Sequence, residues 1–193
     1  ATSAIYGDIE ALDVATFMDG SSIVVGSFST RIETQVAGEA RLYQAPGLHN
    51  RDGFAAGVDA HGNLSWLRQI SSVGHDKAAA VHMASPTRAL VVGTFCEGCV
   101  AGDSLDKPAL ADVSFATQGG SDIFVFEVDV YGNVHELKTL GSMGNDLGMG
   151  VTPLADAGMA LSGVLGGELS IDDQLFSLGE SSSSAFVARF AAD

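Results

Sequence analysis

Residues 121–144 have the sequence SDIFVFEVDVYGNVHELKTLGSMG, and this stretch decides the fold. Residues 123–130 are rich in β-branched and aromatic side chains, and residues 134–140 resume an alternation of apolar and polar side chains, which is typical of two strands. Between them stands the segment Asp129-Val130-Tyr131-Gly132-Asn133. Because Asp hydrogen-bonds nearby backbone N–H groups and Gly and Asn tolerate positive φ, this segment predicts a hairpin turn.

The same hairpin occurs elsewhere in the chain. Residues 52–70, DGFAAGVDAHGNLSWLRQI, place Asp59 and Gly62 70 positions before Asp129 and Gly132. A third copy, AFVARFAAD, begins at residue 185.

A second block also recurs, in residues 7–28, 74–95 and 144–165. Its matched glycines Gly26, Gly93 and Gly163 each fall 19 positions after the glycine that opens the block. Self-similarity at a fixed period is the signature of a repeat architecture. The sequence therefore predicts three repeats, 7–73, 74–143 and 144–193, within a single domain of residues 1–193.

Each repeat predicts four strands joined in sequence, which is the composition of a β-propeller blade. We expect an all-β fold of three four-stranded blades, in which residues 1–6 complete the last repeat. Propellers typically close with about four to eight blades. Three blades therefore predict either a six-bladed ring in a homodimer or an arc of a larger propeller, and the symmetric dimer is favoured because a closed assembly removes both open ends.

The charge excludes some partners. The formal net charge is −15, with nine Lys and Arg residues, so the chain would repel nucleic acid and anionic lipid. No apolar run approaches the roughly 20 residues that span a bilayer, so membrane insertion is not expected. The sequence begins Ala1-Thr2-Ser3 without Met or a basic segment, which fits a processed product or an excised fragment equally.

The two cysteines form the motif Cys96-Glu97-Gly98-Cys99. A thioredoxin-type site would need a following helix and a zinc site would need about four ligands, and the sequence predicts neither. A disulfide between Cys96 and Cys99 is the favoured interpretation, with free thiols and metal or redox chemistry as alternatives. A disulfide would place the protein outside the cytosol.

These motifs together resemble the bacterial β-propeller repeat family, often called seven-bladed β-propeller repeats. The resemblance rests on SDIFVFEVDVYGNVHELKTLGSMGND and DGFAAGVDAHGNLSWLRQISSVGHD, followed by ALVVGTF and SIVVGSF. The aromatic residue after the turn is kept as Trp66 and replaced by His135, and the last copy has Ala191 in place of the turn Asp. The resemblance implies a secreted or surface-attached bacterial protein, usually part of a longer chain, and supplies no catalytic residues.

One cation site is a candidate. Asp8, Asp76 and Asp146 open the loop before the first strand of each repeat, on the side that lies nearest the channel of a propeller. Three converging carboxylates could bind Ca²⁺ through oxygen ligands. The alternative is that each aspartate only caps a turn; no other cofactor is expected.

Ligand contacts are expected in the irregular connections, because loops on a rigid scaffold usually hold binding residues. Arg31, Arg41, Tyr43 and His49 stand out in residues 29–50 of this acidic chain, although a solvated loop explains them as well. The five histidines occupy non-equivalent positions, and the sequence has no nucleophile elbow, phosphate-binding glycine loop or helix-borne zinc motif. No catalytic residue is therefore assigned.

The sequence predicts a non-enzymatic binding or scaffold module, located outside the cell, in the periplasm or on the bacterial cell surface. Its expected partners are further copies of itself, a larger parent assembly, or a protein or glycan ligand. A carbohydrate-binding propeller is one alternative, supported by Trp66 alone. A hydrolase or lyase is another, and it would need a histidine and acidic residues to meet in the channel.

Overall fold

The computed structural model describes residues 4–45, 50–99, 117–171, 174–176 and 183–191. This part of the chain consists of β-strands, turns and loops without a helix, and its strands form several antiparallel sheets, none of which closes on itself. Nothing helical in these ranges is long and apolar enough to span a membrane.

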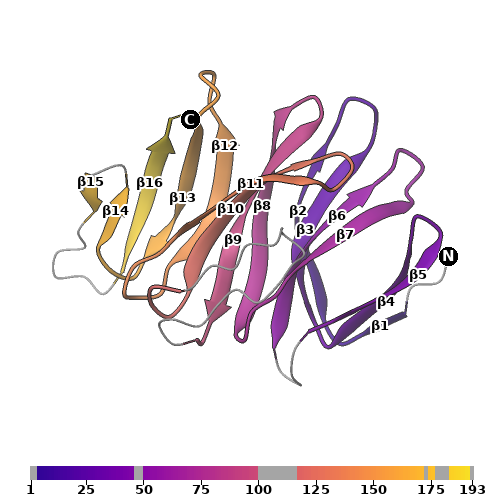
Figure 1. Cartoon of the computed structure of the whole chain (residues 1–193), viewed down its shortest axis with the longest axis horizontal. Coiled ribbons are helices and arrows are strands. Elements are labelled where there is room, and N and C mark those ends of the chain that lie inside the picture. Colours follow the sequence, from indigo (N-terminus) through magenta and orange to yellow (C-terminus); the bar gives the residue numbers. More distant parts are fainter. Residues whose placement is uncertain (1–3, 46–49, 100–116, 172–173, 177–182, 192–193) are drawn as a thin grey trace.

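Two four-stranded sheets make up the first two thirds of the structure (Figure 1). The first sheet, in spatial order, contains β2 (Ile9–Thr16), β3 (Ser22–Ser29), β6 (Arg51–Val58) and β7 (Leu64–Ile70). The second sheet contains β8 (His75–Ser85), β9 (Arg88–Glu97), β10 (Asp122–Asp129) and β11 (Val134–Leu140). In each sheet the strands lie side by side in chain order, as the repeats predict.

The rest of the structure is built from shorter sheets. The third sheet contains β12 (Leu147–Pro153), β13 (Met159–Leu165) and β16 (Ser184–Phe190). The hairpin sheet contains β1 (Ala4–Tyr6), β4 (Arg31–Val36) and β5 (Glu39–Gln44). A two-stranded ribbon contains β14 (Leu169–Ile171) and β15 (Gln174–Phe176). In the connection between β3 and β6, β4 and β5 form a hairpin around Gly38.

The end of the chain differs from the prediction. Among the described residues the third sheet has three strands rather than four, and β1 pairs with β4 through Ala4 and Glu33 instead of with β16. The strands β1 and β16 lie toward opposite ends of the structure (Figure 1). Residues 4–6 therefore do not complete the third sheet of their own chain, because the β4–β5 hairpin offers them a nearer free edge.

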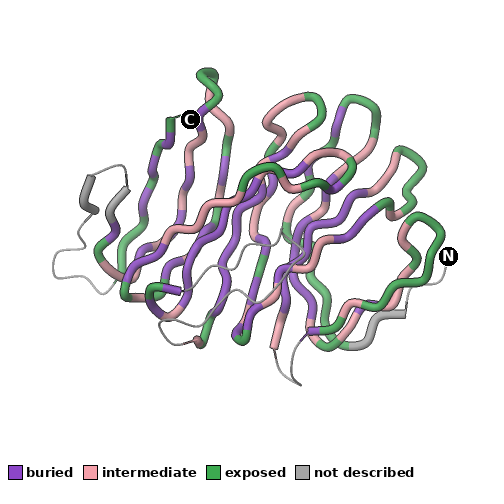
Figure 2. Tube along the Cα trace, in the orientation of Figure 1, coloured by how far each residue is buried: buried purple, intermediate pink, exposed green. Residues whose placement is uncertain are grey.

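The three large sheets stack face to face, and a hydrophobic core fills each gap (Figure 2). Between the first and second sheets the core includes Val25, Phe124 and Phe126, and the two phenylalanine rings stack with their centroids 5.8 Å apart. Between the second and third sheets it includes Val125 and Leu161. The strand β10 of the second sheet thus buries alternating side chains on both of its sides, as expected for a sheet covered on both faces.

The predicted turns form as the sequence indicates. Asp59 Oδ1 accepts hydrogen bonds from the backbone N–H groups of His61 and Asn63, and Asp129 Oδ1 accepts the equivalent bonds in the second sheet. Gly62 and Gly132 have φ values of 84° and 83°, a conformation that favours glycine. The recurring Asp and Gly are therefore turn chemistry.

The matched glycines have a packing role. A Cβ at Gly26, Gly93 or Gly163 would lie 1.8, 2.0 or 2.0 Å from a carbonyl oxygen of the neighbouring strand. Each glycine pairs across the sheet with a phenylalanine, and at Gly93 the ring of Phe124 lies against the missing side chain. The repeat keeps glycine here because the inner strand and an aromatic ring both approach the backbone closely.

Candidate functional site: two equivalent grooves between the sheets

A groove of about 300 Å³, here called the first groove, lies between the first and second sheets. It is lined by the turn after β2, by the ends of β6 and β7, and by the β10–β11 turn of the next sheet. Its residues are Phe17, Asp19, Ser21, Ser22, Ile23, Gly57, Val58, Asp59, Ser65, Trp66, Val130 and Tyr131.

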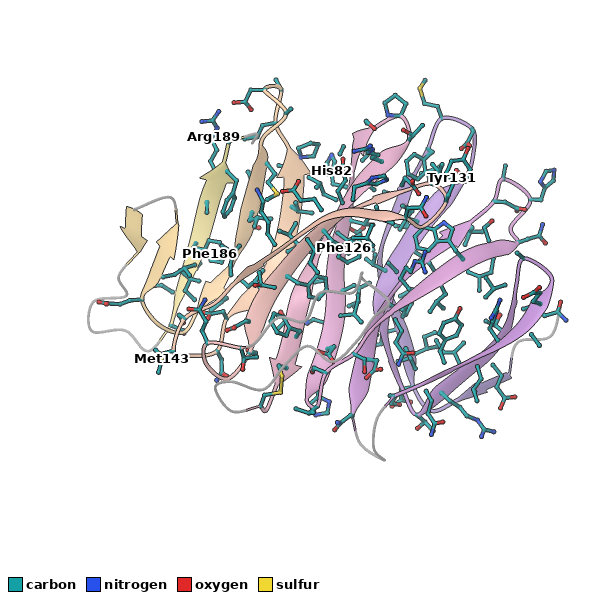
Figure 3. All side chains as sticks on the ribbon, in the orientation of Figure 1. His82, Phe126, Tyr131, Met143, Phe186 and Arg189 are labelled. Atoms are coloured by element: carbon teal, nitrogen blue, oxygen red, sulfur yellow. A yellow bond between two sulfur atoms is a disulfide. The ribbon has the colours of Figure 1, made fainter. Side chains whose placement is uncertain are left out.

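Two side chains from β7 fix the shape of the first groove. The Trp66 Nε1 donates to the carbonyl of Val130 at 2.9 Å, and the Arg68 Nε donates to the carbonyl of Gly132 at 2.7 Å. Both bonds hold the β10–β11 turn of the second sheet against the first. Tyr131 lies on that turn and is largely exposed (Figure 3), so its ring is free to contact a ligand at the rim.

A larger groove of about 530 Å³, here called the second groove, lies between the second and third sheets. Its walls contain two ion pairs, Arg88–Glu127 at 2.8 Å and Lys138–Glu136 at 2.9 Å. The full lining is Ala84, Ser85, Arg88, Leu90, Glu127, Glu136, Lys138, Pro153, Leu154, Ala157, Gly158, Met159 and Ala191.

The two grooves use equivalent strand positions of the repeats, and one cross-strand pair of residues shows how their linings differ. Gly57 pairs across the sheet with Trp66, whereas Glu127 pairs with Glu136 at the same position 70 residues later. A Cβ on Gly57 would lie 2.2 Å from the indole nitrogen, so glycine is what lets the tryptophan lie across the strand. The second groove has two carboxylates in place of the glycine and the indole.

This pairing corrects one detail of the sequence comparison. The residue equivalent to Trp66 is Glu136, and His135 is instead the extra residue of a β-bulge between Glu127 and Val128. The first sheet has the same bulge, with Ser65 at the place of His135. The His135 Nε2 lies 3.0 Å from Asp129 Oδ2. This histidine–carboxylate pair supports the turn, and the lining of the two grooves contains no histidine.

The contents of the grooves suggest different ligands. The first groove combines an exposed phenol ring with the carboxylates of Asp19 and Asp59 and several serine hydroxyls. Hydrogen bonds within the turns hold the pKa of both carboxyls below the usual value: Asp19 is bonded by Ser21, and Asp59 mainly by Asn63. A ring face beside fixed hydrogen-bond acceptors suits a polyhydroxylated ligand. The second groove offers both signs of charge over an apolar floor.

The three aspartates predicted to bind a cation are not brought together. Asp8 is exposed, whereas Asp76 and Asp146 are buried in different sheets. Within the described ranges no group of three or more His, Cys, Asp or Glu side chains could hold a metal ion. Asp76 accepts hydrogen bonds from the N–H groups of Ser72 and Cys96, and Asp146 accepts from those of Ser142 and Gly166. Both therefore cap loops, which was the alternative interpretation.

Two further aspartates that the sequence reasoning missed lie beside this pair. Asp52 and Asp122 are buried at the starts of β6 and β10, and the Oδ1 of each has no hydrogen-bond partner in the described part of the chain. Burial raises the pKa of each to about 6. Burial, with a smaller contribution from the charge of Asp52, raises the pKa of Asp76 to about 7. The signal that could have found them is their spacing of 70 residues.

The predicted ligand residues of the first connection lie on the hairpin sheet. Arg31 forms an ion pair with Glu33 at 3.1 Å, and Arg41 forms one with Glu39 at 2.7 Å. Tyr43 packs beside the core under this sheet, and burial raises its pKa against the opposing charge of Arg41. His49 lies outside the described residues. Both arginines are thus engaged by neighbouring glutamates, and neither lines the two grooves.

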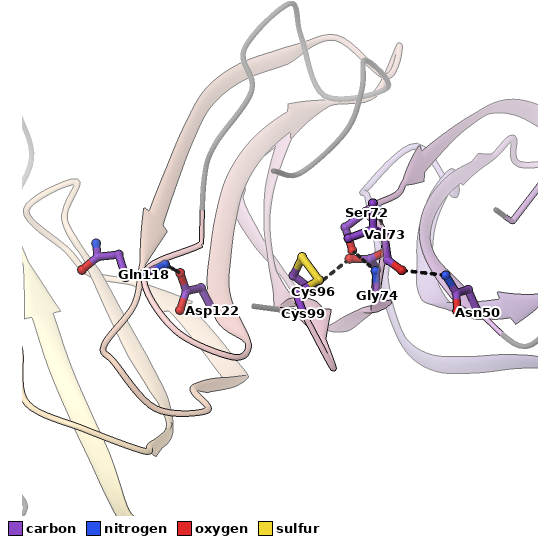
Figure 4. Close-up of a disulfide and its surroundings, with 9 residues drawn as sticks. Asn50, Ser72, Val73, Gly74, Cys96, Cys99, Gln118 and Asp122 are labelled. Atoms are coloured by element: carbon purple, nitrogen blue, oxygen red, sulfur yellow. Dashed lines mark hydrogen bonds between the residues drawn. A yellow bond between two sulfur atoms is a disulfide. The ribbon is translucent and has the colours of Figure 1, made fainter. Parts of the chain in front are cut away.

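The predicted disulfide is present (Figure 4). Cys96 and Cys99 are bonded, with their Cα atoms 5.2 Å apart, and they close a tight turn in which the Cys99 N–H donates to the Cys96 carbonyl at 2.9 Å. The disulfide lies against Gly74, where a Cβ would approach Cys99 Sγ to 2.8 Å. It therefore supports the loop that leads into β8 and toward Asp76.

Reducing this disulfide is expected to lower the free energy of unfolding by no more than about 2 kcal/mol, because the closed loop is very short and constrains the unfolded chain little. Urea unfolding with and without a phosphine reductant measures the difference. The Cys96→Ala, Cys99→Ala double variant is the control, since the reductant should not change its midpoint. Complete unfolding on reduction would contradict this minor role.

No family model and no curated protein matches this chain.

Proposed function

We propose that this chain is a β-propeller-type binding module, built from three blades and acting outside the bacterial cytosol. The observation that supports it best is the pair of equivalent grooves between successive sheets, which share a backbone frame and differ in their contents. A repeated scaffold with variable grooves is suited to binding, since binding residues usually stand on loops and edges of a rigid frame. The disulfide fits an oxidising compartment.

Carbohydrate binding is the second candidate, and the first groove favours it. Trp66 alone is buried and structural, but Tyr131, Asp19 and Asp59 add an exposed ring and two acceptors at the same place. The hydrolase or lyase alternative has less support, because the Asp129–His135 pair belongs to a turn rather than to a groove.

The test combines a glycan array with activity assays on nitrophenyl glycosides and uronate polymers. Binding without turnover supports a carbohydrate-binding module. The absence of both binding and turnover would contradict the carbohydrate candidate and leave protein binding. Release of nitrophenol or of an unsaturated product would contradict the non-enzymatic proposal.

If the array identifies a glycan, Tyr131→Ala is expected to weaken its binding about tenfold, because the ring supplies the exposed aromatic surface of the first groove. Isothermal titration with that glycan measures the change. Met143→Ala is the matched control, since Met143 is equally exposed and lies at the opposite end of the sheets (Figure 3). Equal affinity in both variants would place the ligand elsewhere.

A further inference from the structure

Every sheet in the stack has two different faces. The back face points toward the preceding sheet, and the front face points toward the following one. In β10, Phe124 and Phe126 pack on the first sheet, while Ile123 and Val125 pack on the third. Equivalent residues keep the same direction, because Phe54, Phe124 and Phe186 pair in register with Gly26, Gly93 and Gly163.

The front face of the third sheet is uncovered. Val187 is 74% exposed, whereas the equivalent residues Val125 and Ala55 are 2% and 0% exposed because the next sheet covers them. Across the strand from Val187 lies Ser162. The neighbouring front-face residues Ala160, Val164 and Ala185 are small or apolar, and Arg189, which pairs with Ala160, forms an ion pair with Asp156. The centre of this face therefore resembles the faces that pack between sheets, although no sheet of the described chain covers it.

The back face of the first sheet is uncovered at β2. Val14, on β2, is 57% exposed, whereas its equivalents Val81 and Val151 are 5% and 8% exposed in the two inter-sheet cores. Val81 shares its core with Ala55, and Val151 shares its core with Val125. Within the chain, each equivalent of Val14 is thus covered by a sheet that presents an equivalent of Val187.

The two end faces also complement each other in shape. The hairpin sheet lies along β7, where the Ala37 N–H donates to the carbonyl of Leu64 at 3.1 Å and the Gln69 amide donates to the carbonyl of Gln44 at 2.9 Å. It shares a core with Phe28, Phe54 and Leu67, so it covers the back face of β3, β6 and β7 and leaves β2 open. The open strand β2 is equivalent to β8, the strand through which the second sheet packs on the first.

We propose that the front face of the third sheet binds the back face of the first sheet of a second copy of this chain. Two such contacts, one in each direction, join six sheets and leave no end face exposed. Six sheets fall within the usual range of about four to eight blades. The inference rests on the proposed propeller geometry, and it does not depend on what the grooves bind.

The first test is the mass in solution at about 0.15 M salt, where screening limits repulsion between two chains of net charge −15. We expect twice the chain mass of 19.8 kDa. Val14→Asp and Val187→Asp should each weaken the dimer about a hundredfold or more, because each places an unpaired carboxylate in the contact. Met18→Asp, a similar change on the exposed turn after β2, should leave the dimer intact.

The second test identifies which faces meet. Val14→Cys and Val187→Cys variants are mixed and treated with a short bismaleimide. We expect a covalent dimer only when both variants are present. A monomer, an open polymer, or cross-linking of Val187→Cys with itself would overturn the proposal. The folding control compares the thermal unfolding of the Asp variants with that of the parent chain, at a protein concentration below the dissociation constant of the dimer. An unchanged melting temperature shows that the variants still fold. If the chain is a monomer and still binds a glycan, the proposed function holds and the proposed contact between two copies is wrong.

Discussion

Raising the pH from about 5 to about 8 is expected to destabilise the folded chain by on the order of 3 kcal/mol, because three buried carboxyls must ionise. Burial raises the pKa of Asp52 and Asp122 to about 6 and that of Asp76 to about 7, all above the value near 3.8 in the unfolded chain. The folded state therefore holds more protons than the unfolded state in this window. The stability from these groups is fully present below about pH 4 and is lost as the pH rises through 6 and 7.

Other carboxyls oppose this trend in acid. Hydrogen bonds from Asn133 and His135 outweigh desolvation and lower the pKa of Asp129 to about 2. Its contribution is present above pH 3.8 and is lost as the pH falls toward 2. Stability should therefore be highest at mildly acidic pH.

Guanidinium unfolding at about pH 5 and pH 8 measures the slope. Asp52→Asn and Asp122→Asn should each flatten it, because an amide keeps a hydrogen-bond acceptor and does not ionise. Glu39→Gln, at an exposed ion pair, is the control and should leave the slope unchanged. Greater stability at pH 8 than at pH 5 in the parent chain would contradict the prediction.

Gly93→Ala is expected to lower the free energy of unfolding by roughly 3 kcal/mol or more, because the added methyl has no space. It would lie 2.0 Å from the carbonyl of Lys77 and 2.5 Å from the ring of Phe124. The change must separate β8 from β9 or displace the ring from the core between the first two sheets.

Gly62→Ala provides the matched comparison for this prediction. It makes the same substitution at a turn with positive φ and open space around the missing side chain. Backbone strain alone should cost about 1 kcal/mol there. Urea unfolding of both variants measures the contrast. An equal loss of stability in the two variants would mean that crowding around Gly93 does not explain why the repeat keeps glycine there.

The sequence was informative wherever a residue acts on its own neighbours. Asp129 and Gly132 specify a turn through local hydrogen bonds and φ, and the three matched glycines report close backbone contacts within a sheet. The disulfide was also predictable, because only three positions separate Cys96 from Cys99. These features depend on short range chemistry that a repeated pattern displays directly.

The site was less predictable because it depends on which sheet faces which. Asp76 and Asp146 recur in the repeats, but recurrence alone does not distinguish convergence on an axis from capping of separate loops. His135 follows the turn, but the 70-residue spacing and the shared bulge make it equivalent to Ser65, so Glu136 takes the place of Trp66. The strand β1 pairs with the free edge of β4 rather than with that of β16. The sequence of residues 4–6 does not distinguish these two edges.

The exchange of Gly57 and Trp66 for Glu127 and Glu136 has a consequence for protein engineering. Both grooves contain this cross-strand pair at equivalent positions of the repeat, so the pair contributes to the character of each groove. Grafting Glu127→Gly together with Glu136→Trp would transplant the aromatic version into the neighbouring cleft and leave the first one intact. The lining of one groove could thus be changed without altering the other.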